Sequence, residues 1–271
     1  MSRTGWLVVA GVLLAGLLGA SAIAPEFLSV PEPSRAYLLP WEAPPFGTDD
    51  RGIGLHEVAL QGAAIVTLPA LASAAVVALL ATIAGLVRCM GFTWLDGALH
   101  GVMELVGSLP RLVVVLVVAL ILPRGWEGLL PIGLTWALLA APGAMDEAAA
   151  TAGRLGGERF VEALRAHGFS STRIHLYHVV WLNLRPVLVR QAAEVLMQVV
   201  FLEIGLSYLA LRRSEPSFTH PDSSFSWATL LYQGYTALLG VELWHALALG
   251  LALVAAVALL STSLRLAARP R

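Results

Sequence analysis

The chain has 271 residues, of which 58% are hydrophobic and 13% are charged, and its formal net charge at pH 7 is −1. A soluble domain carries about 25% charged residues, so the composition excludes an ordinary soluble domain and indicates a membrane protein. All 17 basic residues are arginine, and Cys89 is the single cysteine. The sequence therefore offers no lysine for a phosphate-binding loop or a Schiff base, no internal disulfide and no multi-thiolate metal site.

The sequence predicts an all-α membrane protein with about six transmembrane helices, because a bilayer core requires about 20 apolar residues per helix. The predicted spans are Trp6–Ala24, Val58–Val87, Leu105–Leu122, Gly128–Met145, Pro186–Leu211 and Leu243–Leu264. Pro110 and Arg111 interrupt the third of them. The first span also resembles a cleaved signal peptide that ends at Ala22-Ile23-Ala24. We expect it to be retained, because Pro25 directly after the cut disfavours cleavage.

The arginines predict the orientation of these spans. If both termini are cytoplasmic, ten arginines lie in cytoplasmic segments: Arg3, Arg88, Arg154, Arg159, Arg165, Arg173, Arg185, Arg265, Arg269 and Arg271. Five then lie in outer segments: Arg35, Arg51, Arg124, Arg212 and Arg213. Short arginine-rich loops resist translocation, so we expect both termini inside.

Two polar segments are predicted to be outer loops. Residues 25–54 are rich in proline and acidic residues, and we expect a short interfacial helix around Leu55–Leu60 after them. Residues 212–227, with the sequence RRSEPSFTHPDSSFSW, form the second polar and turn-rich loop.

Two short patterns resemble catalytic sites but lack the residues that would complete them. His56-Glu57 begins like a zinc-peptidase helix, but Leu60 stands where the second metal-binding histidine is required. Ser207 would need a base to act as an intramembrane nucleophile, and His245 is placed near the outer end of the last span. An intramembrane enzyme is therefore an alternative that the sequence does not favour, and we expect no catalytic, cofactor-binding or metal-binding residue.

The segment RFVEALRAHGFSSTRIHLYH, Arg159–His178, is polar within an otherwise apolar chain. A helix over Leu155–His167 would be amphipathic, with an apolar face formed by Phe160, Val161 and Leu164. We expect Gly168 to end this helix and Ser170-Ser171-Thr172 to cap the next one. Such a helix is suited to binding a partner, although an ordinary interfacial helix has the same pattern. The histidines at 167, 175 and 178 are spaced too loosely for a metal site and are interpreted as solvated.

Several ordered motifs carry a resemblance to a known family. Glu162, Ala163, Leu164 and Gly168 match the pattern E-A-A, three residues, G, except that leucine replaces the second alanine. This segment resembles the EAA loop of bacterial ABC importer permeases. More specifically, the chain resembles the second membrane subunit of the dipeptide/oligopeptide/nickel family, over residues 44–271. Segments that resemble other family motifs are PFGTDDRG at 45–52, Trp94-Leu95-Asp96 with Pro110, the turn at Pro142-Gly143, and EIGLSYL at 203–209.

Two departures indicate a divergent member. Trp181 replaces the proline usual at the end of the EAA loop, and the C-terminal motif N-L-L-G-D-x-L-R-D is reduced to Leu264-Arg265.

The resemblance implies an N-terminal transmembrane helix and outer loop at 1–43 and a permease domain at 44–271. It implies a subunit that forms the translocation path for peptides, nickel or a related small solute in the bacterial inner membrane. Its implied partners are a second permease subunit, two cytosolic ATPase subunits and an extracytoplasmic solute-binding protein, with no nucleic acid. The implied ATPase-coupling residues are Phe160, Val161, Glu162, Ala163, Leu164 and Gly168.

Four charged residues fall within or near the predicted spans: Arg111, Arg190, Glu194 and Glu203. A charge at mid-bilayer costs about 2.5–3.5 kcal/mol on insertion scales, so these side chains should face protein or water. Arg190 and Glu194 are four residues apart and can pair. Arg111, Glu194 and Glu203 are candidates for the translocation path or for structural roles, and Glu104 is the alternative partner for Arg111. An ion-coupled secondary transporter, with Glu194 and Glu203 as proton sites, is the alternative function.

Overall fold

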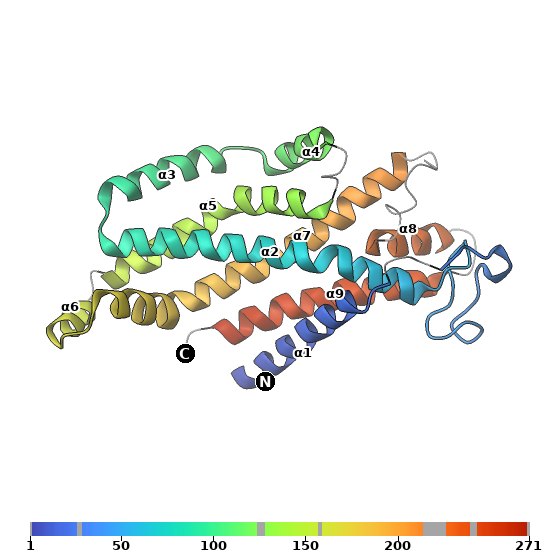
Figure 1. Ribbon diagram of the computed structural model, residues 1–271, viewed down its shortest axis with the longest axis horizontal. Helices are drawn as coiled ribbons and strands as arrows, with labels where there is room; N and C mark the ends of the chain where they lie inside the picture. The colour runs from blue at the N-terminus through green and yellow to red at the C-terminus, as the bar shows by residue number, and fades with distance from the viewer. Residues whose placement is uncertain are drawn as a thin grey trace. The chain divides into compact units, whose positions relative to one another are not determined.

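The computed structural model describes residues 2–25, 29–123, 128–156, 159–213, 226–238 and 243–269, without the side chains at 156, 159–160, 208–213 and 236–238. Every regular element in these ranges is a helix (Figure 1). One isolated antiparallel bridge, between Thr48 and Gly54, is the only β-type pairing within the described ranges. The all-α prediction is therefore confirmed for this part of the chain.

Four helices are long and apolar enough to cross a membrane: α1 (Arg3–Ala22), α2 (Leu55–Met90), α5 (Leu129–Gly156) and α9 (Trp244–Ala268). Two shorter helices, α3 (Thr93–Gly107) and α4 (Arg111–Ile121), meet that standard together and are bent by 79° at their junction, so they form a broken span or a re-entrant loop. The prediction of a membrane protein is confirmed by these helices. The helix α7 (Arg185–Arg213) has 29 residues but is not among those that qualify.

Two local predictions are wrong. The short interfacial helix expected around Leu55–Leu60 is instead the beginning of α2, because no helix-breaking residue separates it from the apolar run that follows. The turn expected at Pro142-Gly143 is absent from the described chain, since α5 continues through Pro142 to Gly156. A proline removes one helical hydrogen bond, and apolar helices tolerate this loss where neighbouring helices support them.

The helices group into two compact units. Unit 1 consists of Met1–Trp6, Pro69–Leu196 and Thr262–Arg271. Within it α5 packs against α3, α4 and the π-helix η2 (Arg173–Leu184). A small buried core joins α2, α3 and α5 through Ala84, Met103, Ala141 and Met145. The Arg3 guanidinium donates a hydrogen bond to the Ala267 carbonyl over 2.6 Å, so the two terminal segments lie side by side.

Unit 2 consists of Leu7–Leu68 and Met197–Ser261. It contains the segment between α1 and α2, with the short helix η1 (Pro33–Arg35), and the helix α8 (Trp227–Leu238). Trp227 is fully buried, and its indole N–H donates to the Ala59 carbonyl of α2 over 3.0 Å. The Trp227 side chain is buried and its N–H has a hydrogen-bond partner, so this residue stabilises the packing of α8 against the beginning of α2.

Candidate functional site

The helix α6 (Arg159–Ala166) is a short segment between α5 and η2 (Figure 1). It is shorter than the predicted Leu155–His167, because α5 extends to Gly156 and residues 157–158 lie outside the described chain. The short helix predicted from the polar segment is nevertheless present, directly before Gly168.

Gly168 ends α6 as the sequence predicts. Its φ is +82°, in the left-handed region. The Gly168 N–H donates to the Arg165 carbonyl over 2.9 Å, and the Phe169 N–H donates to the Leu164 carbonyl over 3.1 Å. These two bonds form a Schellman motif, which satisfies carbonyls that the helix itself leaves without partners. The chain therefore reverses at a fixed angle after α6.

The predicted coupling residues of α6 differ in exposure. Glu162 and Ala163 are exposed, and Leu164 is half-buried. Val161 is only 3% exposed, so the chain itself already covers this side chain. The Phe160 side chain lies outside the described part. Of the predicted apolar face, Leu164 is the described residue that still presents surface to a partner.

The chain continues from the Gly168 turn into an unusual helix. The Ser170 hydroxyl accepts a hydrogen bond from the Arg173 N–H over 3.4 Å, which confirms Ser170 as a capping residue. Residues Arg173–Leu184 then form a π-helix of 12 residues. Such helices are rare, are mostly single turns, and occur frequently at functional sites.

The sequence led us to expect that all three histidines of this segment are solvated, and this prediction is wrong for one of them. His167 is exposed, but His175 is only 3% exposed, and its Nδ1 lies 2.7 Å from the Ser171 carbonyl oxygen. His175 is carried inward by the π-helix, whose register cannot be read from an α-helical pattern. Among the described residues, no three histidine, cysteine or acidic side chains are placed to hold a metal ion.

A second group of polar residues was not predicted as a site. Arg88, Asp96, His100 and Asp146, from α2, α3 and α5, line a cavity of about 560 Å³ in unit 1, which we name the polar cavity. Arg88 forms an ion pair with Asp96. His100 Nδ1 lies 3.7 Å from an Asp146 carboxylate oxygen. The missed signal was the continuation of α5 beyond Met145, which makes Asp146 part of a helix rather than of a loop.

The next residue of α5, Glu147, is bound from α7. Arg190 donates to one carboxylate oxygen, and the Gln191 amide donates to the other over 2.6 Å. The structure thus gives Arg190 an ion-pair partner on another helix, where the spacing had suggested Glu194.

The three candidate path residues do not form one site within either unit. Arg111 begins α4 in unit 1, is exposed, and has no ion pair within 4 Å among the described residues. Glu194 also belongs to unit 1 and is half-buried with an interaction inside the protein. Glu203 belongs to unit 2 and is only 3% exposed.

Glu203 is also the hydrogen-bond partner of Ser207, the residue considered above as an intramembrane nucleophile. The Ser207 hydroxyl donates to a Glu203 carboxylate oxygen over 2.9 Å, one helical turn earlier on α7. A hydroxyl held by a buried carboxylate is not arranged like a nucleophile paired with a histidine base.

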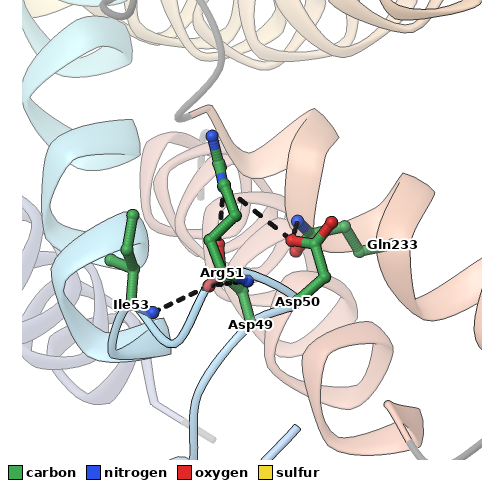
Figure 2. A network of polar contacts seen from close by, with 5 residues as sticks. All are labelled: Asp49, Asp50, Arg51, Ile53 and Gln233. Atoms are coloured by element: carbon green, nitrogen blue, oxygen red, sulfur yellow. Dashed lines mark hydrogen bonds and ion pairs between the residues drawn. The ribbon is translucent and has the colours of Figure 1, made fainter. Parts of the chain in front are cut away.

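The segment before α2 forms an ordered polar network (Figure 2). One oxygen of the Asp49 carboxylate accepts the N–H groups of Arg51 and Ile53 over 2.9 and 2.8 Å. The Arg51 guanidinium lies 3.3 Å from Asp49 and 3.8 Å from Asp50. The Gln233 amide of α8 donates to Asp50 over 2.9 Å. Burial raises the pKa of the Asp50 carboxyl, the Asp49 charge raises it further, and Arg51 opposes both effects.

Comparison with known proteins adds no assignment to these sites. The sequence matches no protein-family model, and no curated protein matches it.

Proposed function

We propose that this chain is a permease subunit of an ATP-driven importer of the dipeptide/oligopeptide/nickel type. In this proposal the chain lies in a bacterial inner membrane with both termini in the cytoplasm. The observation that carries the proposal is α6 with its Schellman turn at Gly168. A short polar helix that ends in a defined turn is suited to receiving a motion from a cytosolic partner.

The grouping of the chain supports the proposed orientation. Both ends of the chain and α6, with the arginines around it, belong to unit 1. The positive-inside tendency favours the cytoplasm for these arginine-rich segments. The six-span arrangement then counts the bent pair α3–α4 and the charged helix α7 as spans.

Energy would come from separate ATPase subunits, because the chain has no lysine for a phosphate-binding loop. In the proposed complex Leu164 contacts an ATPase cleft, with Glu162 and Ala163 exposed beside it. Val161 supports α6 from within the chain, and Gly168 sets its direction.

The solute path would be formed with a second permease subunit, and the solute would be delivered by an extracytoplasmic binding protein. The polar cavity supports a place for this path in unit 1. Its side chains at His100 and Asp146 are 70% and 58% exposed. Polar and charged side chains with this exposure are unfavourable in lipid, so they are expected to face water or the second subunit.

The proposal is tested by co-purification of the ATPase subunits with Leu164→Asp. A charge placed in a desolvated contact should abolish recovery of the ATPase while leaving the chain in the membrane, since no span is altered. Ala166→Asp is the matched control, because it adds the same charge to another face of α6. Equal recovery of the ATPase with Leu164→Asp and with the unaltered chain would remove the coupling role from α6.

Ion-coupled secondary transport is the second candidate, and the buried carboxyl of Glu203 favours it. A buried carboxyl inside a transport protein is a typical proton-relay group. Transport that requires a proton gradient, proceeds without ATPase subunits and is lost with Glu203→Gln would establish this alternative. Transport that needs the ATPase and survives Glu203→Gln would exclude it.

A further inference from the structure

A second cavity lies in unit 2, between helices that qualify as membrane spans. It has a volume of about 510 Å³ and is lined by α1, α2 and α9, with Trp227 and Phe46 also contributing. Its size is within the range of about 300–1,000 Å³ that is usual for ligand pockets. Helices α1 and α9 run alongside each other in Figure 1, and residues of both line the cavity.

The lining of this cavity selects an apolar occupant. Apart from His56 and Trp227, every lining residue is aliphatic, aromatic without a polar atom, or glycine. The Trp227 N–H already donates to the Ala59 carbonyl. His56, whose Nδ1 has no hydrogen-bond partner among the described residues, is then the one polar group that the lining offers. A strongly polar solute would lose most of its hydration here without replacing those hydrogen bonds, so the cavity favours an apolar occupant.

The cavity is also continuous with the apolar exterior. Val12 lines it and is nevertheless 65% exposed, and Phe46, which also lines it, is 42% exposed. Further exposed apolar residues flank it on the same helices, at Val8 of α1 and Leu251 of α9. Exposed apolar side chains on a membrane-spanning helix are covered by lipid. Lipid is therefore the apolar molecule available where this cavity opens to the exterior.

We propose that the acyl chain of a bilayer phospholipid occupies this cavity, as a bound lipid between α1, α2 and α9. The small residue Gly16 makes room for it, because a Cβ added there would meet no atom within 4 Å although Gly16 lines the cavity. His56 stands at the beginning of α2, where the glycerol region of such a lipid lies. This lipid site is independent of the proposed transport function.

The site is tested with a phosphatidylethanolamine that carries a photoreactive diazirine in its acyl chain. The protein is reconstituted into vesicles of phosphatidylethanolamine and phosphatidylglycerol with this probe, irradiated, and digested to map the cross-linked peptides. We expect cross-links on residues that line the cavity from α9, such as Leu253, beyond those on residues that simply face lipid, such as Val8.

Gly16→Leu should fill the cavity. Each methylene that the new side chain displaces changes partitioning roughly fourfold, so cross-linking at Leu253 should fall roughly tenfold or more. Gly11→Leu is the matched control, since Gly11 lies on the same helix, does not line the cavity and has equally open space. Ala256→Leu fills the cavity from α9 and serves as a second variant if Gly16→Leu does not fold.

Two results would overturn the proposal. The first is equal cross-linking at Leu253 in Gly16→Leu and Gly11→Leu, which would show lipid outside the cavity only. The second is no lipid adduct on any residue that lines the cavity in the unaltered chain while Val8 is labelled, which would show that no acyl chain occupies the cavity.

Discussion

Gly168 and Gly91 lie in equivalent turns, so substitutions at the two glycines can separate an effect on coupling through α6 from an effect on the stability of the protein. Gly91 follows α2 with φ +75°. Its N–H bonds to the Arg88 carbonyl, and the next N–H, of Phe92, bonds to the Val87 carbonyl, over 3.3 and 3.4 Å. This is the same motif as at Gly168, with the same residue type, phenylalanine, after the glycine. In both cases a Cβ would meet no atom within 4 Å.

The cost of adding a side chain at these glycines is therefore set by the backbone alone. A non-glycine residue in the left-handed region costs about 1–2 kcal/mol. Replacing glycine by alanine recovers about 0.4–1 kcal/mol from the unfolded state. We expect Gly168→Ala and Gly91→Ala each to destabilise the protein by about 1 kcal/mol, which a chain with a typical stability of 5–15 kcal/mol tolerates.

The functional effects should differ although the stabilities match. A valine at 168 strains the turn further and misdirects α6, so Gly168→Val should lose transport and recover less ATPase, whereas Gly91→Val should retain both. Gly168→Asn should restore coupling, because asparagine tolerates the left-handed conformation. The measurements are thermal unfolding in detergent, ATPase co-purification and transport. Equal coupling in the two valine variants would refute the assignment of α6 as the coupling element.

Three further predictions follow from the orientation, from Arg111 and from Asp50. In a Cys89→Ser background, an impermeant thiol reagent added to intact cells should label Ser34→Cys and spare Ser171→Cys until the cells are permeabilised; the reverse pattern would contradict the orientation. Arg111→Leu should reduce transport of anionic solutes more than transport of neutral ones, and equal retention of both would remove Arg111 from the path. Because the pKa of Asp50 is raised in the folded state, its ionisation opposes folding, and this opposition disappears as the pH falls through the raised pKa. Hydrogen exchange at residues 49–53 should therefore slow on acidification in the unaltered chain but less in Asp50→Asn, which keeps an oxygen for Gln233.

The long helices and the Gly168 turn could be predicted because their causes are local. An uninterrupted run of apolar residues forms a helix wherever lipid or protein surrounds it, and this holds for α1, α2 and α9. A glycine after an amphipathic segment has few alternatives to the left-handed conformation, so φ at Gly168 follows from the sequence.

The remaining features depend on which helices meet. The 79° bend between α3 and α4 occurs at Pro110, but the proline alone fixes the place of the break and not its angle. The burial of His175 follows from the π-helix, whose five-residue hydrogen bonds shift every side chain relative to an α-helix. The ion pair between Arg190 and Glu147 joins residues 43 apart, and no spacing rule within one helix could reveal it.

The two arginines within predicted spans, Arg111 and Arg190, differ in whether a carboxylate of the same chain offsets their charge. Arg190 is held by the carboxylate of Glu147, so its charge is offset on the next helix and needs nothing outside the protein. Arg111 stands at the beginning of α4, exposed and without an ion pair among the described residues, and the neighbouring surface of α4 is apolar at Leu112 and Val113. Lipid would make such a charge unfavourable by about 2.5–3.5 kcal/mol at mid-bilayer. In the proposed permease, water in the path, a solute or the second subunit would offset this charge. Under the proposed function we therefore expect Arg111, rather than the buried Glu203, to lie on the translocation path.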